Sequence, residues 1–220
     1  MLMGVLMLAT AGVMWWYGNA DPEEGQAAIP IRVDVLEEEI AVRTGAERLA
    51  LQRELVAMLK AEGAFERAAR VQEEVARAVD TPAAWKEAGA LYFNAMDQSS
   101  DKTRLAGRVI EAFERVLAHD PEDLDVRTDL AVACYLDPSR RHRAIEETRA
   151  VLRRDPGHLA AAFNLGIFLS QEGRADEAVP WFEQVAREGQ PGSRLQREAA
   201  RILRVLREHP GLPSGETTSE

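Results

Sequence analysis

Leu117-Ala118-His119-Asp120-Pro121 and Leu152-Arg153-Arg154-Asp155-Pro156 are two copies of one phrase, placed 35 residues apart. Each copy closes a stretch of apolar residues at helical spacing, and Asp-Pro stops such a helix because proline disfavours a helical residue before it. A second phrase recurs as Glu62-Gly63-Ala64-Phe65-Glu66-Arg67-Ala68 and Glu172-Gly173-Arg174-Ala175-Asp176-Glu177-Ala178. A period in the mid-thirties predicts an array of helical hairpins.

The hairpin predicted at residues 159–192 shows why small residues recur. Gly166 in its first helix and Ala178 in its second are expected where two antiparallel helices touch. A larger side chain there would push the helix axes beyond about 8–10 Å. Gly173 is expected to supply the left-handed residue that lets the chain reverse between the two helices. This hairpin sets the register for the rest of the array.

Two segments resemble the tetratricopeptide repeat, a helix–turn–helix unit of about 34 residues with a Trp, Leu-Gly, Tyr, Ala, Phe, Pro skeleton. Residues 159–192 match it without a gap, and residues 124–158 match it with one extra residue. The matching residues are Leu165, Gly166, Ala178 and Phe182 in the former and Leu130, Ala131, Ala144, Val151, Leu152 and Pro156 in the latter. Thr148 stands where the second helix usually places an aromatic residue, so residues 124–158 are expected to pack least tightly.

Two further segments fit the repeat less closely. Residues 82–123 hold about eight extra residues around 97–104, and residues 49–81 lack the terminal proline. The matching residues are Trp85, Gly89, Tyr92, Phe113, Leu117 and Pro121 in the former and Leu55, Gly63, Phe65 and Ala68 in the latter. The resemblance implies an all-α fold, a right-handed α-solenoid of about four hairpins within a domain at residues 49–209.

Residues 193–209 are predicted to form a capping helix, because a stack of hairpins must cover its last apolar face with a helix that is polar outside. Apolar and basic residues fall on opposite faces, Leu195, Ala199, Ile202, Leu203 and Leu206 against Arg194, Arg197, Arg201 and Arg204. The arginines are expected to keep this end soluble; a site for anionic lipid or an acidic partner is the alternative. Residues 210–220 lack apolar periodicity and are predicted to be a disordered tail.

Residues 1–20 carry no charged side chain and are almost wholly apolar as far as Tyr17. Twenty helical residues span about 30 Å, one hydrocarbon core, so this segment is predicted to be a single transmembrane anchor. A cleaved signal peptide ending at Gly18-Asn19-Ala20 is the alternative. The acidic residues that follow favour a repeat domain on the periplasmic side of a bacterial inner membrane, or in the alternative a protein secreted to the periplasm.

Residues 21–48 are predicted to be an acidic linker followed by a short helix. The segment from Asp21 to Pro30 is rich in acidic and turn-forming residues. Ile31, Val33 and Val35 then alternate with polar residues, which fits one short strand or an extended tether. From Leu36 onward the pattern becomes helical.

The chain of 220 residues carries 27 Lys and Arg and 37 Asp and Glu, a formal net charge of −10. This balance argues against a nucleic-acid partner, because phosphate neutralisation needs clustered cations. The single cysteine, Cys134, excludes an internal disulfide and a multi-thiolate metal site. The four histidines fall at expected helix ends without metal-ligand spacing, and the acid pairs Glu73-Glu74 and Glu146-Glu147 are expected on helix surfaces.

The sequence contains no glycine-rich phosphate loop, nucleophile elbow or zinc-binding helix motif. It therefore predicts no enzyme activity, no cofactor, no metal site and no small-molecule substrate. What the repeats offer instead is a surface, with a protein or a peptide segment as the partner.

In arrays that this chain resembles, the first helices of successive hairpins line a concave groove that grips a peptide or a partner helix. The register assigns to that groove Arg53, Ala57, Lys60, Lys86, Ala90, Phe93, Asn94, Thr128, Asp129, Val132, Tyr135, Phe163, Asn164, Ile167 and Ser170. Thr128, Asp129 and Phe163 interrupt the cationic cluster that holds a terminal carboxylate in some such proteins, so a partly apolar segment is predicted. The alternative for Phe163 and Ile167 is that they pack beneath the capping helix.

The layout of an anchor followed by a few repeats favours a membrane-anchored scaffold that mediates protein–protein interactions, as an assembly or chaperone-like factor in the cell envelope. A permanent structural subunit of a membrane complex is one alternative. A c-type cytochrome biogenesis factor that binds apocytochrome segments, with no haem ligand from this chain, is another.

Overall fold

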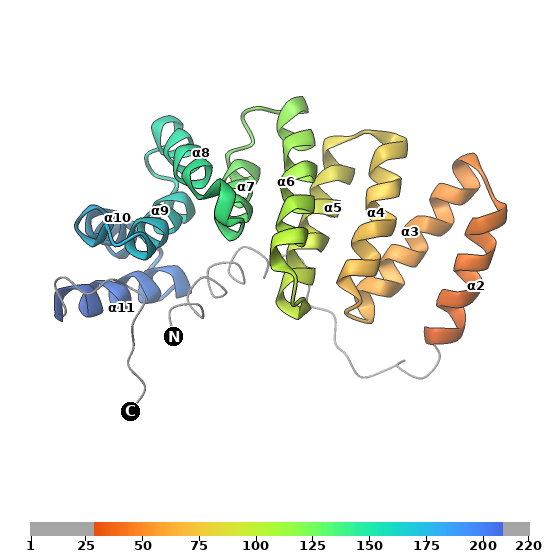
Figure 1. Ribbon diagram of the computed structural model, residues 1–220, viewed down its shortest axis with the longest axis horizontal. Helices are drawn as coiled ribbons and strands as arrows, with labels where there is room; N and C mark the ends of the chain where they lie inside the picture. The colour runs from red at the N-terminus through yellow and green to blue at the C-terminus, as the bar shows by residue number, and fades with distance from the viewer. Residues whose placement is uncertain (1–28, 209–220) are drawn as a thin grey trace. The chain divides into compact units, whose positions relative to one another are not determined.

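The computed structural model describes residues 29–208, with side chains from residue 33 onward. This part of the chain is all-α and divides into two compact units between Asp137 and Pro138. Within each unit the helices follow one another in chain order (Figure 1). The predicted anchor at residues 1–20 and the predicted tail at residues 210–220 lie outside the described residues.

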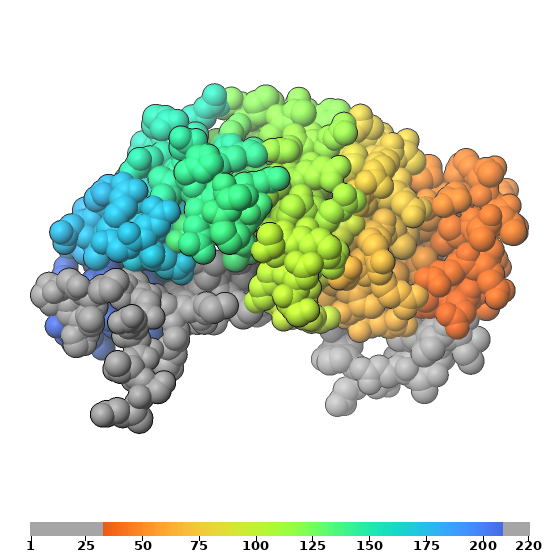
Figure 2. Space-filling view, in the orientation of Figure 1, coloured from red at the N-terminus to blue at the C-terminus, as the bar shows by residue number. Residues whose placement is uncertain are grey.

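The first unit is built from helices that each pack against the next one along the chain. In chain order they are α2 (Ile29–Val42), α3 (Gly45–Ala61), α4 (Phe65–Val79), α5 (Pro82–Ala95), the short 3-10 helix η1 (Met96–Gln98), α6 (Lys102–His119) and α7 (Leu124–Leu136). In the space-filling view the atoms of neighbouring helices of this unit form a continuous surface (Figure 2).

The second unit begins with a short 3-10 helix and continues with four α-helices among residues 138–208. They are η2 (Pro138–Arg140), α8 (Arg141–Arg154), α9 (Leu159–Gln171), α10 (Ala175–Glu188) and α11 (Arg194–Glu208). Here too each α-helix packs against its successor.

The division between the two units falls inside residues 124–158, the segment in which Thr148 predicts the loosest packing. The first helix of that segment, α7, belongs to one unit, and the second, α8, belongs to the other. Thr148 itself is buried within the second unit, and its hydroxyl donates to the Ala144 carbonyl at 2.8 Å.

The two copies of the glycine phrase form the same helix cap. Gly173 has a left-handed φ of 75°, and the amide of the next residue donates to the Leu169 carbonyl at 2.9 Å. Gly63 has a φ of 71°, and the amide after it donates to the Leu59 carbonyl at 2.8 Å. Such a cap satisfies carbonyls at the helix end, and glycine takes the left-handed conformation there without the steric cost of a side chain. The turn predicted for Gly173 is confirmed.

The two copies of the Asp-Pro phrase end α6 and α8, as predicted. In each copy the aspartate amide still donates to the carbonyl four residues earlier, at 2.9 Å for Asp120 and 2.8 Å for Asp155. Its carboxylate then accepts an amide of the following turn, at 3.1 Å for Asp120 and 2.9 Å for Asp155. The aspartate thus finishes the helix and begins the turn.

A glycine and a phenylalanine ring bring the two helices of a hairpin together in each unit. A Cβ placed on Gly89 of α5 would lie 2.4 Å from the Phe113 ring of α6, and one on Gly166 of α9 would lie 2.8 Å from the Phe182 ring of α10. Both rings are buried. The close approach predicted at Gly166 is therefore confirmed, and Gly89 repeats it.

The predicted extra residues in segment 82–123 are split between the turn and the second helix. Gly89 and Phe113 are 24 residues apart, whereas Gly166 and Phe182 are 16 apart. Helix α6 begins 13 residues after Gly89, whereas α10 begins nine residues after Gly166, so η1 and its loop take up four of the extra residues. The other four lengthen the start of α6 by about one turn.

Residues 31–35 are helical, so the prediction of a strand or an extended tether there is wrong. They belong to α2, which packs against α3. Val33, Leu36 and Ile40 are buried and recur at helical spacing. Alternation over five residues fits a strand and the start of a helix equally well, and the apolar residues that follow decide between them.

Helix α11 packs against α10 in the manner of the predicted capping helix, with Ala199, Ile202 and Leu203 buried. Its arginines are exposed on the opposite side. Among the helices of residues 29–208, none combines the length and the apolar character that crossing a membrane requires.

Replacing Gly166 with leucine should destabilise the second unit. The new side chain has no room beside the Phe182 ring, and overpacking of this kind costs about 1–3 kcal/mol or more. Gly107→Leu in α6 is the matched control, because a Cβ there meets nothing within 4 Å. Removing a mid-helix glycine should raise stability by about 0.5–1 kcal/mol. Urea unfolding followed by circular dichroism measures both effects, and equal shifts in the two variants would contradict the assigned packing.

Candidate protein-binding surface

The predicted groove residues of α3 and α5 form the open part of the candidate surface. Those of α3 are exposed and those of α5 are half-buried. In each helix they recur at intervals of three or four residues, so they share one side of that helix. We call this set the first-helix face, and its members are Arg53, Ala57, Lys60, Lys86, Ala90, Phe93 and Asn94.

Two ion pairs link the first-helix face to neighbouring helices. Lys60 Nζ of α3 lies 3.0 Å from Glu87 Oε1 of α5. Lys86 Nζ of α5 lies 3.1 Å from Oδ2 of Asp123, the residue that caps α7. Partly exposed pairs of this kind contribute at most about 1 kcal/mol each. The first pair nevertheless shows that Lys60 of α3 reaches α5 within the first unit.

Asp129 of α7 continues the polar character of this region. Burial raises the pKa of its carboxyl to about 7, the negative charges of Asp125 and Asp123 add to the rise, and Lys86 opposes it. Around neutral pH this side chain therefore exists in both its neutral and its charged form, so it offers a hydrogen-bond donor as well as an acceptor.

The other predicted groove residues of α7 belong to the core. Thr128, Val132 and Tyr135 are buried. The Thr128 hydroxyl donates to the Leu124 carbonyl at 2.8 Å, within its own helix. These three side chains therefore do not extend the exposed surface.

The predicted groove residues of α9 are also buried. Phe163 is only 2% exposed, and its ring meets the Phe182 ring edge-on with centroids 5.6 Å apart. The others, Asn164, Ile167 and Ser170, are buried as well. Phe163 thus packs against α10 in the interior. This position is closer to the predicted alternative, packing beneath the capping helix, than to an exposed position in a groove.

A buried polar cluster behind the first-helix face corrects one prediction. Glu73 of α4, expected on a helix surface, is 4% exposed, and its carboxylate accepts the Tyr92 hydroxyl of α5 at 2.5 Å. The same carboxylate pairs with Arg77 and with Arg108 of α6. The Arg108 guanidinium also lies over the Tyr92 ring, 5.7 Å from its centroid. One carboxylate therefore ties α4, α5 and α6 together.

The position of Glu73 within its helix is the signal that the sequence offered. It follows Ala69 by four residues and precedes Ala76 by three, and both alanines are buried. That spacing places Glu73 on the inner side of α4. An acid on an inner stripe requires a partner, and Tyr92 and Arg108 supply it.

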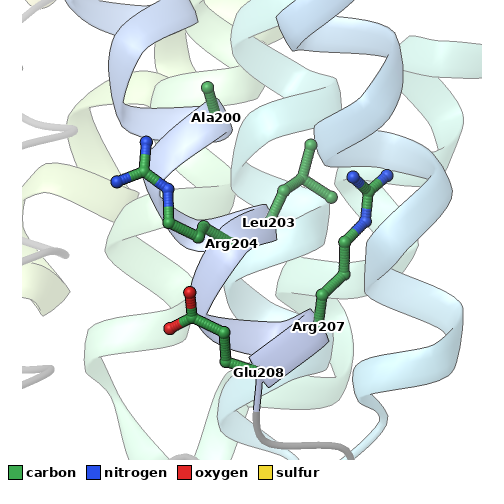
Figure 3. A pocket seen from close by; sticks show the side chains of 5 residues that line it. All are labelled: Ala200, Leu203, Arg204, Arg207 and Glu208. Carbon is green, nitrogen blue, oxygen red and sulfur yellow. The ribbon is translucent and has the colours of Figure 1, made fainter.

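A separate pocket lies on α11, apart from the predicted groove residues. Figure 3 shows the five side chains that line it, Ala200, Leu203, Arg204, Arg207 and Glu208. Four of the five are exposed.

The part of the chain at residues 29–208 contains no group of histidine, cysteine and acidic side chains arranged to hold a metal ion. Cys134 is buried in α7. The exposed side chains of α3 and the half-buried ones of α5 suit the binding of another chain.

Comparisons with known proteins agree with this repeat architecture. Residues 135–194 match the family described as tetratricopeptide repeat. A crystal structure of MamA is similar with a TM-score of 0.54 and 17% identity, over 71% of this chain and 85% of that one. A crystal structure of MamA protein is similar with a TM-score of 0.52 and 19% identity, over 73% of this chain and 80% of that one. The structure of MamA MSR-1 C2 has a TM-score of 0.51 and 18% identity, over 87% of this chain and 95% of that one. At these identities the likeness shows the fold.

The search of curated proteins found no match. The match to the repeat family begins at Tyr135 and covers α8, α9 and α10, together with the first residue of α11. The similar structures extend the likeness to helices outside that segment, since each covers more than two thirds of this chain.

Tyr92→Phe should remove a pH-dependent contribution to stability. Burial, together with the hydrogen bond to Glu73, raises the pKa of Tyr92 to about 12 from its usual 10. A group whose pKa is raised on folding contributes stability that is present below the unfolded pKa and is lost as the pH rises through the folded pKa. The free energy of unfolding of wild type should therefore exceed that of the variant by about 1.5–3 kcal/mol near pH 8, since the hydroxyl donates to a charged acceptor.

That difference should shrink between about pH 10 and pH 12, where the Tyr92 hydroxyl loses its proton. Urea unfolding of both proteins across this range measures it. The subtraction removes the effect of lysine titration, which the two proteins share. A constant difference from pH 8 to pH 12 would show that the hydroxyl does not donate to Glu73.

Proposed function

We propose that this chain, of which residues 135–194 match the tetratricopeptide repeat family, is a scaffold that binds a segment of another protein along the first-helix face. The observation that carries this proposal is the contrast in exposure among the predicted groove residues. All seven on α3 and α5 are exposed or half-buried, whereas those on α9 are buried. Binding is therefore assigned to the first unit.

The side chains of the first-helix face indicate the chemistry of the segment that it binds. Ala57, Ala90 and Phe93 supply apolar contact, and a half-buried aromatic ring is the kind of anchor that dominates protein interfaces. Lys60 and Lys86 are neutralised by Glu87 and Asp123. Within the described residues Arg53 has no ion-pair partner. A partly apolar segment that carries an acidic residue opposite Arg53 fits these features.

The same proposal places the protein in the cell envelope. Residues 1–20 are uncharged and acids follow them, which supports an anchor in a bacterial inner membrane with the repeats on the periplasmic side. A scaffold there serves as an assembly or chaperone-like factor. Binding of an apocytochrome segment is one form of that role, and secretion after signal cleavage is the alternative for its location.

Phe93→Glu should weaken partner capture by about tenfold or more, because a charge replaces an aromatic anchor. The measurement is the yield of a crosslinked partner from native membranes, with helicity recorded by circular dichroism. Ala57→Glu repeats the test at an exposed position of α3 and should also weaken capture. Ala78→Glu on the exposed side of α4 is the control and should leave capture unchanged. Equal loss in all three variants, or no loss in the first two, would contradict the assigned face.

The mode of binding separates a transient scaffold from a permanent subunit. A scaffold that handles client segments should release its partner when an unlabelled competitor is added, with an affinity near micromolar. A structural subunit should co-purify at a fixed ratio and resist exchange. Fixed, non-exchangeable co-purification would replace the proposed role with the permanent-subunit alternative.

The proposed topology has its own test. A reporter that is active only in the periplasm, fused after Ser219, should be active in cells that produce the full chain. The same fusion to a chain that starts at Asp21 is the control and should be inactive. Activity of a cytoplasmic reporter at the same position would contradict the periplasmic assignment.

A further inference from the structure

Two helices carry the large apolar side chains that stay exposed among residues 33–208. Val35 and Val42 of α2 are 47% and 73% exposed, and Val205 of α11 is 46% exposed. These are the first and the last helices that the structure describes, and each packs against one main neighbour through its inner side. Their outer sides therefore combine apolar and charged groups that no described part of the chain covers.

The outer side of α2 is acidic. Val35, Glu38, Glu39 and Val42 are exposed at the spacing i, i+3, i+4 and i+7, so they form one stripe along the helix. The inner stripe of Val33, Leu36 and Ile40 faces α3. Over its length α2 holds four acids and one arginine, a net charge of −3.

The outer side of α11 is basic. Arg197, Arg201, Arg204 and Val205 are exposed and share one side of the helix. Arg201 pairs with Glu198 of its own helix, and Arg204 has no ion-pair partner among residues 29–208. Over its length α11 holds five arginines and two glutamates, a net charge of +3.

We propose that the outer side of α11 in one copy of this chain docks on the outer side of α2 in a second copy. Val205 packs against Val35 and Val42, while Arg201 and Arg204 pair with Glu38 and Glu39. The valines supply apolar contact in the middle of two otherwise polar stripes, and the charges set the orientation. None of these residues belongs to the first-helix face.

Charge complementarity is what selects a second copy as the occupant. The whole chain carries a net charge of −10, so two copies repel each other unless opposite charges meet locally. The basic outer side of α11 and the acidic outer side of α2 bring such charges together. The two stripes differ from each other, so the contact is heterologous, and repeated contacts build either a ring or an open series.

Charge reversal at each stripe tests the proposal in the full chain. The protein is held in a non-ionic detergent, because its first seventeen residues are almost wholly apolar, and its association is followed by sedimentation velocity. Wild type should associate as its concentration rises in about 0.05 M salt and should associate more weakly in about 0.5 M salt. The acidic-stripe variant, Glu38→Lys with Glu39→Lys, and the basic-stripe variant, Arg201→Glu with Arg204→Glu, should each associate at least about tenfold more weakly.

An equimolar mixture of the two variants is the decisive sample. In the mixture the new lysines of one variant face the new glutamates of the other, and both unaltered stripes also find their complements. Association should therefore return to about the wild-type level, although each variant alone associates only weakly. Arg70→Glu with Arg153→Glu is the control for net charge, since both arginines are exposed and lie on other helices; it should associate like wild type.

Three results would overturn the proposal. A wild-type chain that stays monomeric at about 0.2 mM in low salt would show that the stripes do not join copies at a meaningful affinity. Stripe variants that associate as well as wild type would place the contact elsewhere. A mixture that stays dissociated, while circular dichroism shows both variants folded, would show that the two stripes are not each other's partners.

Discussion

The close approach of a glycine to a phenylalanine ring is the constraint on which each unit depends. Gly89 lets Phe113 of the next helix lie against the backbone of α5, and Gly166 does the same for Phe182 and α9. Any side chain at either glycine would meet a buried ring at less than contact distance. The pair sets how near the two helices of a hairpin come, and so decides which side of the first helix is turned away from the second.

That separation has a consequence for α5. With Phe113 and the Glu73 cluster on its packed sides, Trp85, Leu91 and Tyr92 are buried, while Phe93 is half-buried. The buried carboxylate of Glu73 holds three helices at once, and losing one member of a buried, charged cluster costs more than losing an exposed pair. The first-helix face is thus supported from behind by a close-packed and hydrogen-bonded core.

Local patterns in the sequence predicted the hairpins well. Gly173, Gly166 and the two Asp-Pro phrases act within a few residues of their positions, so their roles are visible without the fold. Two features depend on contacts between helices. Phe163 was predicted in an open groove, with packing beneath the capping helix as the alternative, and its ring is covered by contacts with a later helix. Glu73 was predicted on a surface, yet its carboxylate is enclosed by side chains of the two following α-helices, α5 and α6. The helices that cover a given face follow from tertiary packing.

Exposed ion pairs also link alternate helices of the first unit, α2, α4 and α6. Glu37 of α2 pairs with Arg67 of α4, and Glu66 of α4 pairs with Arg104 of α6. Such pairs add little to stability, but they favour one register of neighbouring helices over others. Glu38 and Glu39 of α2 take no part in this series, and the proposed contact between copies uses them.

The central claim is that a partner binds the first-helix face of the first unit, and position-specific photo-crosslinking in cells tests it most directly. A photoreactive amino acid replaces, one at a time, Ala57, Ala90 and Phe93 on that face and Arg70, Ala78 and Arg153 elsewhere. The account predicts adducts with one and the same partner from the first three positions and none from the other three. Adducts of equal yield from all six positions, or from the second group alone, would contradict it.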